Sequence, residues 1–103
     1  AITESLYFGC PVFGTPYGSL SEIVTKDVGY LSTSKNELVQ ALHNIPQYDR
    51  KRCHERVMDQ FTATHMMQAY LRKYEIVLNG YTLNHHAPVL KEIQDEKFLP
   101  FGE

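Results

Sequence analysis

Two short apolar segments without a charged residue, residues 11–13 and 30–31, constrain the fold of this chain most. Strands that carry no charge are typical of parallel sheets, in which helices cover both faces. A helical pattern with Leu20, Ile23 and Val24 lies between the two segments, and two parallel strands need a connection of this kind. The sequence therefore predicts an α/β fold in which the two segments pair in parallel.

Helical patterns lie on both sides of these strands. Residues 1–8 read as the end of a helix that Gly9 stops. Beyond the second strand, apolar residues at helical spacing predict three longer helices, which end near Pro46, Phe61 and Gly80. A two-stranded sheet is marginal on its own. We therefore expect the chain to be part of a longer protein, whose upstream strands complete the sheet.

Polar residues mark the starts of three of these helices. Ser19 with Glu22 and Ser34 with Glu37 have the spacing of a capping box, in which each side chain bonds a backbone N–H at the other position. Thr62 is expected to cap the last helix. Asp27 and the glycine that follows it at position 29 are expected to turn the chain into the second strand.

The last part of the chain differs in character from the rest. Residues 81–103 begin irregularly, continue with an acidic amphipathic stretch at 91–97 and end apolar at 98–101. We expect an arm that packs against another surface. The predicted organisation is thus a truncated α/β domain over residues 1–80, followed by a C-terminal arm.

Composition excludes several classes of protein. The chain has 103 residues, 43% of them hydrophobic, and a formal net charge of −2, so nothing suggests nucleic acid as a partner. No apolar run is long enough for a transmembrane segment. The chain opens on Ala1 rather than Met, which leaves an upstream signal open. Cys10 and Cys53 are expected to be reduced thiols of a cytoplasmic protein; a peripheral membrane location stays open for the parent.

A resemblance to a known family runs through the first part of the chain. The stretch TESLYFGCPVFGTPYGSLSEIV followed by VGYL resembles the donor-binding half of GT-B-fold retaining glycosyltransferases of glycosyltransferase family 4. Residues 4–12 match the family's second Glu through its Gly-x-Pro-Val, residues 18–24 match its Gly-Gly-x-x-E-I-V segment, and residues 28–31 match its G-x-L strand. The resemblance covers roughly residues 1–78 and implies a partial Rossmann-like fold.

The resemblance assigns roles to three residues. It implies that Glu4 accepts hydrogen bonds from the ribose hydroxyls of the donor nucleotide, a task that suits the paired oxygens of a carboxylate. Ala1 would lie near a turn whose backbone amides face the diphosphate. Gly18 would allow a loop to approach the donor closely, with a plain turn as the alternative.

The sequence also departs from the family pattern. The family's first acid and its Phe-Gly turn would precede Ala1, and Tyr17 replaces the first Gly of Gly-Gly. We therefore expect the chain to be part of a transferase that uses a nucleotide-diphosphate sugar and an unknown acceptor. The transferase is expected to have no cofactor or metal, and the chain alone is expected to be inactive. The fragment is expected to self-associate through an exposed apolar face. The rival hypothesis is a non-catalytic α/β interaction module that docks a partner through residues 81–103.

Other reactive residue types favour structural interpretations. Cys10 lacks a cationic neighbour that would activate a nucleophile. The pair His85-His86 has no ligand partners at metal-binding spacing. The basic residues from 50 to 56 are expected to form a solvated helix face, and Glu22 is expected to cap its helix. The Met and Tyr side chains at residues 66–74 are expected to pack in the core.

Overall fold

The computed structural model describes residues 1–91 and 100–103. It contains two compact units, residues 1–61 with the C-terminal end, and residues 62–97. Most of the expected acidic stretch, together with Phe98 and Leu99, lies outside the described residues. The boundary expected after residue 80, from the change of sequence character, stays a prediction.

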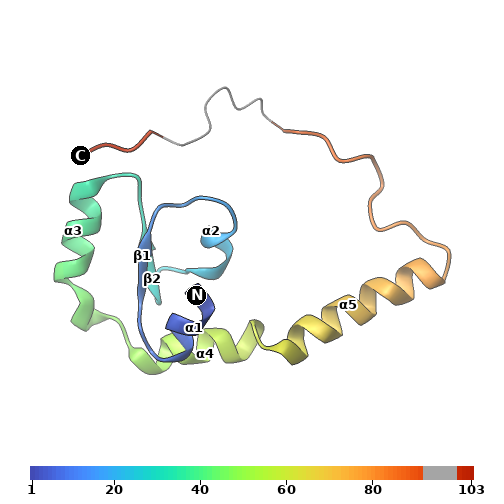
Figure 1. The fold of residues 1–103 in the computed structure, drawn as a ribbon, viewed down its shortest axis with the longest axis horizontal. Coiled ribbons are helices and arrows are strands. Elements are labelled where there is room, and N and C mark those ends of the chain that lie inside the picture. Colours follow the sequence, from blue (N-terminus) through green and yellow to red (C-terminus); the bar gives the residue numbers. More distant parts are fainter. Residues whose placement is uncertain (92–99) are drawn as a thin grey trace. The chain divides into compact units, whose positions relative to one another are not determined.

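The first unit contains short helices and two strands (Figure 1). In chain order its elements are α1 (Ile2–Tyr7), β1 (Val12–Gly14), α2 (Leu20–Ile23), β2 (Gly29–Leu31), α3 (Lys35–His43), the 3-10 helix η1 (Ile45–Gln47) and α4 (Arg50–Gln60). The sequence predicted each of these helices and strands except η1. This 3-10 helix contains Pro46 and follows the end of α3.

The two strands form a parallel pair in which Val12 lies opposite Gly29 and Gly14 opposite Leu31. This confirms the mixed α/β class and the parallel pairing through α2. Gly29, however, does not turn the chain as expected. It is buried within β2, where an added Cβ would lie 2.0 Å from the backbone oxygen of Val12. Its role is the close approach of two strands, which only glycine permits here.

The core of the first unit lies where α1, α2, the strands and α4 meet. Its buried residues are Leu6, Val12, Val24, Val28, Cys53 and Val57. Helix α1 packs against α4 and β1, while α3 contacts both strands. Helix α4 contributes its buried side chains at spacing four, so a single face of the helix meets the core.

The expected stop of the first helix is present at Gly9. Its φ of +80° is favoured by glycine, and its N–H donates to the oxygen of Leu6 over 2.9 Å while the N–H of Cys10 donates to Ser5 over 3.0 Å. This pair of bonds is a Schellman motif, which closes the helix by satisfying its last carbonyl groups. The motif turns the chain back into β1 within a few residues.

The three expected N-terminal caps have different outcomes. Ser34 and Thr62 accept hydrogen bonds from the N–H groups of Glu37 and His65. The reciprocal half of the Ser34–Glu37 capping box is absent, because the N–H of Ser34 donates to the hydroxyl oxygen of Ser32 and the Glu37 carboxylate accepts from that hydroxyl. Ser19 makes no side-chain bond at the start of α2, so its predicted capping box with Glu22 is wrong. Helix α2 has only four residues, and its start is held by backbone bonds to the Ser19 and Tyr17 oxygens instead.

The C-terminal end returns to the first unit. Gly102 forms a parallel bridge with Ser34, donating to the oxygen of Thr33 over 2.9 Å and accepting from the N–H of Lys35 over 2.7 Å. The first N–H of α3 lacks a partner within the helix, so the Gly102 carbonyl satisfies a group that would otherwise need water. The last residues of the predicted arm therefore contact their own chain.

The second unit consists of α5 (Ala63–Leu78) and the segment that follows it. Gly80 has a φ of +85°, consistent with the predicted helix stop. The Met and Tyr side chains of α5 share one face as expected, yet none of its residues is buried; Tyr70 and Tyr74 are 56% and 58% exposed. The expectation that they pack in a core is wrong for this chain. Among residues 1–91 and 100–103, no helix is long and apolar enough to cross a membrane.

Candidate functional site

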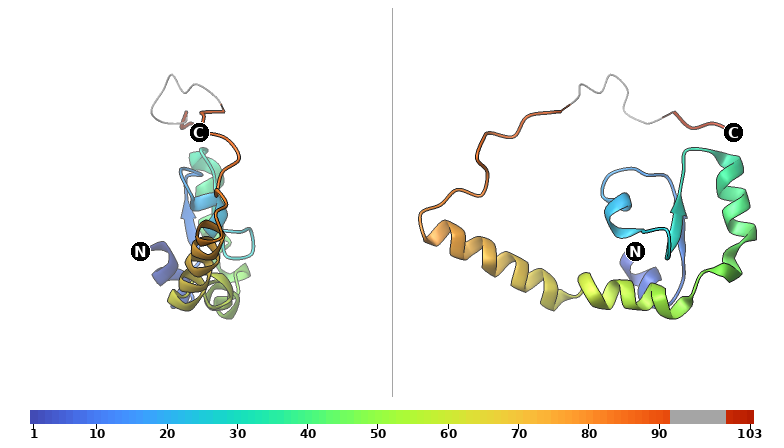
Figure 2. Two further views of the ribbon diagram at one scale, coloured as in Figure 1. Left: turned by 90° about the vertical axis from the view of Figure 1, so that its right-hand side faces the viewer. Right: turned by 180° about the vertical axis from the view of Figure 1, so that it is seen from behind.

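The candidate residues lie on α1 and in the loop that follows β1. Helix α1 begins at the height of the amino ends of the strands, whereas the loop at residues 15–19 leaves β1 at its carboxyl end (Figures 1 and 2). In open α/β sheets, ligands bind outside the carboxyl ends of the strands. The loop with Gly18 therefore lies at the end of the sheet where a nucleotide would be expected, whereas α1, which carries Glu4, begins near the opposite end.

Glu4 is accessible to a ligand. It lies in the first turn of α1 with its side chain 80% exposed. One carboxylate oxygen is 3.5 Å from the amino group of Ala1, which is itself fully on the surface. An exposed ion pair of this kind contributes little to stability. This ion pair therefore leaves the Glu4 carboxylate accessible to a ligand.

Gly18 has a conformational reason to be glycine. Its φ is +55°, and an added Cβ would meet no atom within 4 Å. The backbone conformation, rather than crowding by protein atoms, therefore favours glycine at this position. No hydrogen bond among the described residues joins Gly18 to Glu4.

Side chains of α4 bond the carboxyl end of α1. Arg50 donates from Nε to the oxygen of Gly9 and from one terminal nitrogen to the oxygen of Phe8, each over 3.3 Å. The Nδ1 atom of His54 lies 2.6 Å from the oxygen of Tyr7 and must donate, because a carbonyl oxygen can only accept. The ring of His54 also lies 4.7 Å from that of Tyr7.

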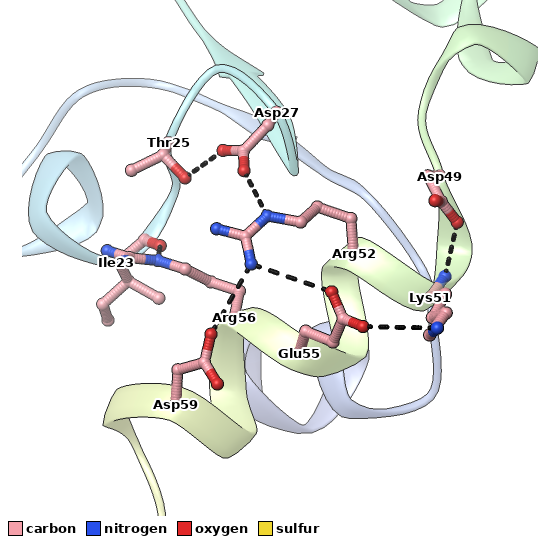
Figure 3. A network of polar contacts seen from close by, with 9 residues as sticks. All are labelled: Ile23, Thr25, Asp27, Asp49, Lys51, Arg52, Glu55, Arg56 and Asp59. Carbon is pink, nitrogen blue, oxygen red and sulfur yellow. Dashed lines mark hydrogen bonds and ion pairs between the residues drawn. The ribbon is translucent and has the colours of Figure 1, made fainter.

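The same helix holds the end of α2 (Figure 3). Arg56 donates from Nε to the oxygen of Ile23 over 3.1 Å and from a terminal nitrogen to the oxygen of Glu22 over 2.7 Å. Its guanidinium carbon lies 5.2 Å from the centre of the Phe61 ring, within the range of a cation–π interaction. These contacts correct two expectations. Arg50 and Arg56 were expected on a solvated helix face, but they bond backbone oxygens of other helices. Glu22 was expected to cap its helix with its side chain, but it contributes its backbone oxygen to the bond with Arg56.

A network of charged residues joins α4 to the turn before β2 (Figure 3). The Nε of Arg52 lies 2.7 Å from a carboxylate oxygen of Asp27, and Arg52 also pairs with Asp59 and Glu55. The hydrogen bond from the Thr25 hydroxyl, followed by that from Arg52, lowers the pKa of Asp27. All of these groups are partly exposed, so the network orients the turn more than it stabilises the fold.

The other candidates show no arrangement for chemistry. Cys10 is exposed, while Cys53 is buried and burial raises the pKa of its thiol, which disfavours a nucleophilic thiolate. Within the described residues no group of three or more potential ligands could hold a metal ion. His85 and His86 are exposed. The structure therefore assigns no catalytic role to the cysteines or to the histidine pair.

Two open cavities lie in separate units. One of about 650 Å³ in the first unit is lined by residues of β2 and of the loops around α2, including Pro16, Lys26 and Tyr30. The other, of about 790 Å³ in the second unit, is lined by the apolar face of α5 together with Leu83 and Asn84. Glu4 lines neither cavity.

Sequence reasoning missed the three side chains of α4 that cap α1 and α2. The available signal was the spacing of Arg50, His54 and Arg56 beside the buried positions Cys53 and Val57, which places them next to the core-facing side of α4.

Comparison of the chain with protein-family models, with curated proteins and with solved structures finds no match.

Proposed function

We propose that this chain is part of the donor-binding domain of a nucleotide-sugar-dependent glycosyltransferase, in which Glu4 binds the ribose of the donor. The observation that carries the proposal is the parallel pairing of β1 and β2 through α2. The three sequence blocks that resemble glycosyltransferase family 4 fall on α1 with β1, on α2 and on β2, in the order that a Rossmann-like half-domain requires.

The chemistry of the exposed groups agrees with this role. A carboxylate has two acceptor oxygens for the neighbouring hydroxyls of a ribose, and within residues 1–91 and 100–103 the Glu4 carboxylate makes a weak, exposed ion pair with the amino group of Ala1. The chain would not transfer sugar alone, because the family's first acid and the acceptor-binding domain lie outside it. We propose a donor nucleotide-diphosphate sugar and an acceptor of unknown class, without a metal or cofactor.

The test is calorimetric titration of the full-length protein with UDP, GDP and ADP. We expect one nucleotide to bind, and Glu4→Ala to weaken its binding by roughly 1–3 kcal/mol, the scale of leaving ligand hydroxyls unpaired. Glu75→Ala is the matched control, because Glu75 is an exposed acid of α5, outside the three blocks that resemble the family. Equal binding by wild type and Glu4→Ala would remove Glu4 from the site, and absence of binding would refute the function.

A second function, a non-catalytic interaction module, is supported by a different observation. Residues of the proposed arm, Leu83 and Asn84, line the open apolar cavity of the second unit together with Tyr70 and Tyr74. Exposed apolar patches of this kind mark interaction surfaces. The nucleotide titration separates the two functions, because a module without a donor site would bind none of the three nucleotides.

A further inference from the structure

The side chains of α4 that cap α1 and α2 bear on the candidate site, because the capped helices carry or adjoin its residues. Each contact is made to the carboxyl end of a short helix: Arg50 and His54 bond oxygens of residues 7–9, and Arg56 bonds the oxygens of residues 22 and 23. The last carbonyl groups of a helix lack partners within it. Cationic donors at that end also interact favourably with the helix dipole.

Helices this short depend on such contacts. Helix α1 has six residues and α2 has four, far below the length at which a helix is stable in isolation. Leu6 is the single buried residue of α1, and α2 has none. Leu6 and the partly buried Ile2 hold α1 against the core, and bonds to three successive carbonyl groups at its carboxyl end add a constraint on its direction. The direction of α1 therefore depends on Arg50 and His54 as well as on the core.

We propose that Arg50, His54 and Arg56 are positioning residues of the nucleotide site. Arg50 and His54 set the direction of α1 and through it the place of Glu4; Arg56 fixes α2 and through it the loop that contains Gly18. Because α4 contacts both helices, it sets the distance between the two halves of the site. This inference rests on the proposed function.

The first experiment compares nucleotide affinity with folding in the full-length protein. Arg50→Ala and Arg56→Ala are expected to weaken binding of the preferred nucleotide about 3- to 10-fold, the effect of losing one or two hydrogen bonds that orient the site. Lys51→Ala is the matched control on the same helix, since the Lys51 side chain is 82% exposed and pairs with Glu55, a neighbour on α4 itself. All titrations are made well below the melting temperature of each variant, with circular dichroism to verify the fold.

A double-mutant cycle distinguishes positioning from simple stabilisation. If Arg50 acts through Glu4, Arg50→Ala has little further effect on affinity once Glu4→Ala has been made. Arg56→Ala, which acts through the Gly18 loop, still weakens binding in the Glu4→Ala background. His54→Asn retains a donor near the position of Nδ1 and is expected to bind the nucleotide like wild type, whereas His54→Ala does not. Should Arg50→Ala fail to fold, Arg50→Lys keeps the charge with a single donor site.

The outcomes separate the two proposals. If the wild-type protein binds no nucleotide, the proposed function fails and this inference fails with it. If wild type binds and the Arg50 and Arg56 variants bind as tightly as Lys51→Ala, the positioning role alone is overturned. If the fold-losses in affinity of Glu4→Ala and Arg50→Ala multiply in the double variant, the positioning role is also overturned, because independent effects would mean that Arg50 does not act through Glu4.

Discussion

Gly29→Ala is predicted to disrupt the pairing of the two strands. A Cβ at this position would lie 2.0 Å from the backbone oxygen of Val12 and 2.7 Å from Cγ1 of Val24, whereas ordinary contact begins at 3.4 Å. A change of rotamer could move the Val24 methyl group but not the Val12 carbonyl. Relief therefore requires the strands to separate, which breaks the bonds that join them.

The size of the effect follows from overpacking. Inserting a methyl group into a packed site costs typically about 1–3 kcal/mol, and a rigid backbone neighbour puts Gly29→Ala at about 3 kcal/mol or above. For a domain of this size each kcal/mol lowers the melting temperature by about 4–8 °C, so we expect a fall of at least about 12 °C. Thermal unfolding followed by circular dichroism measures it.

Gly14 provides the matched control because it is also a strand glycine of this pair. An added Cβ at Gly14 would meet nothing within 4 Å, and its φ is not positive. Gly14→Ala should therefore change stability by no more than about 0.5–1 kcal/mol. Adding Val24→Ala to Gly29→Ala should not restore stability, since the Val12 contact remains. Equal melting temperatures for Gly14→Ala and Gly29→Ala would refute the register of the sheet.

Three further predictions concern separate parts of the chain. Cys10 should react with a thiol reagent at once and Cys53 only on unfolding, because Cys53 is buried and its pKa is raised. Simultaneous reaction of both thiols in the native protein would contradict the packing of α4. The pKa of Asp27 is lowered in the folded state, so its contribution to stability is present above the ordinary pKa of about 3.9 and is lost as pH falls through the lower folded value. In Asp27→Asn, the free energy of unfolding measured with urea should therefore change less between about pH 5 and pH 2 than in wild type. An unchanged pH profile would exclude this contribution. The exposed face of α5 predicts association that rises with concentration in sedimentation experiments and falls in Tyr74→Glu; a monomer at all concentrations would count against it.

The order of elements could be predicted from the sequence because local patterns determine it. Uncharged apolar segments predicted β1 and β2, and Gly9, Ser34 and Thr62 act at helix ends through bonds to neighbouring residues. The burial of α5 could not be predicted, because an amphipathic pattern shows that a face is apolar and not what covers it. Gly29 was misassigned since its crowding comes from Val12, far away in sequence, and only the strand register brings the two together.

The basic residues of α4 were misread for a related physical reason. An ion pair can be anticipated from the charges of two side chains, but Arg50 and Arg56 bond backbone oxygens, which every residue has. No residue type at positions 7–9 or 22–23 could have indicated these partners. Such contacts depend on where helices end, and α1 and α2 end against α4 because the core residues Leu6, Val24 and Val57 bring them there. The positions of α1 and α2 are therefore a consequence of the core, through helix α4, and the nucleotide affinity of the Arg50 and Arg56 variants tests whether the proposed site depends on them.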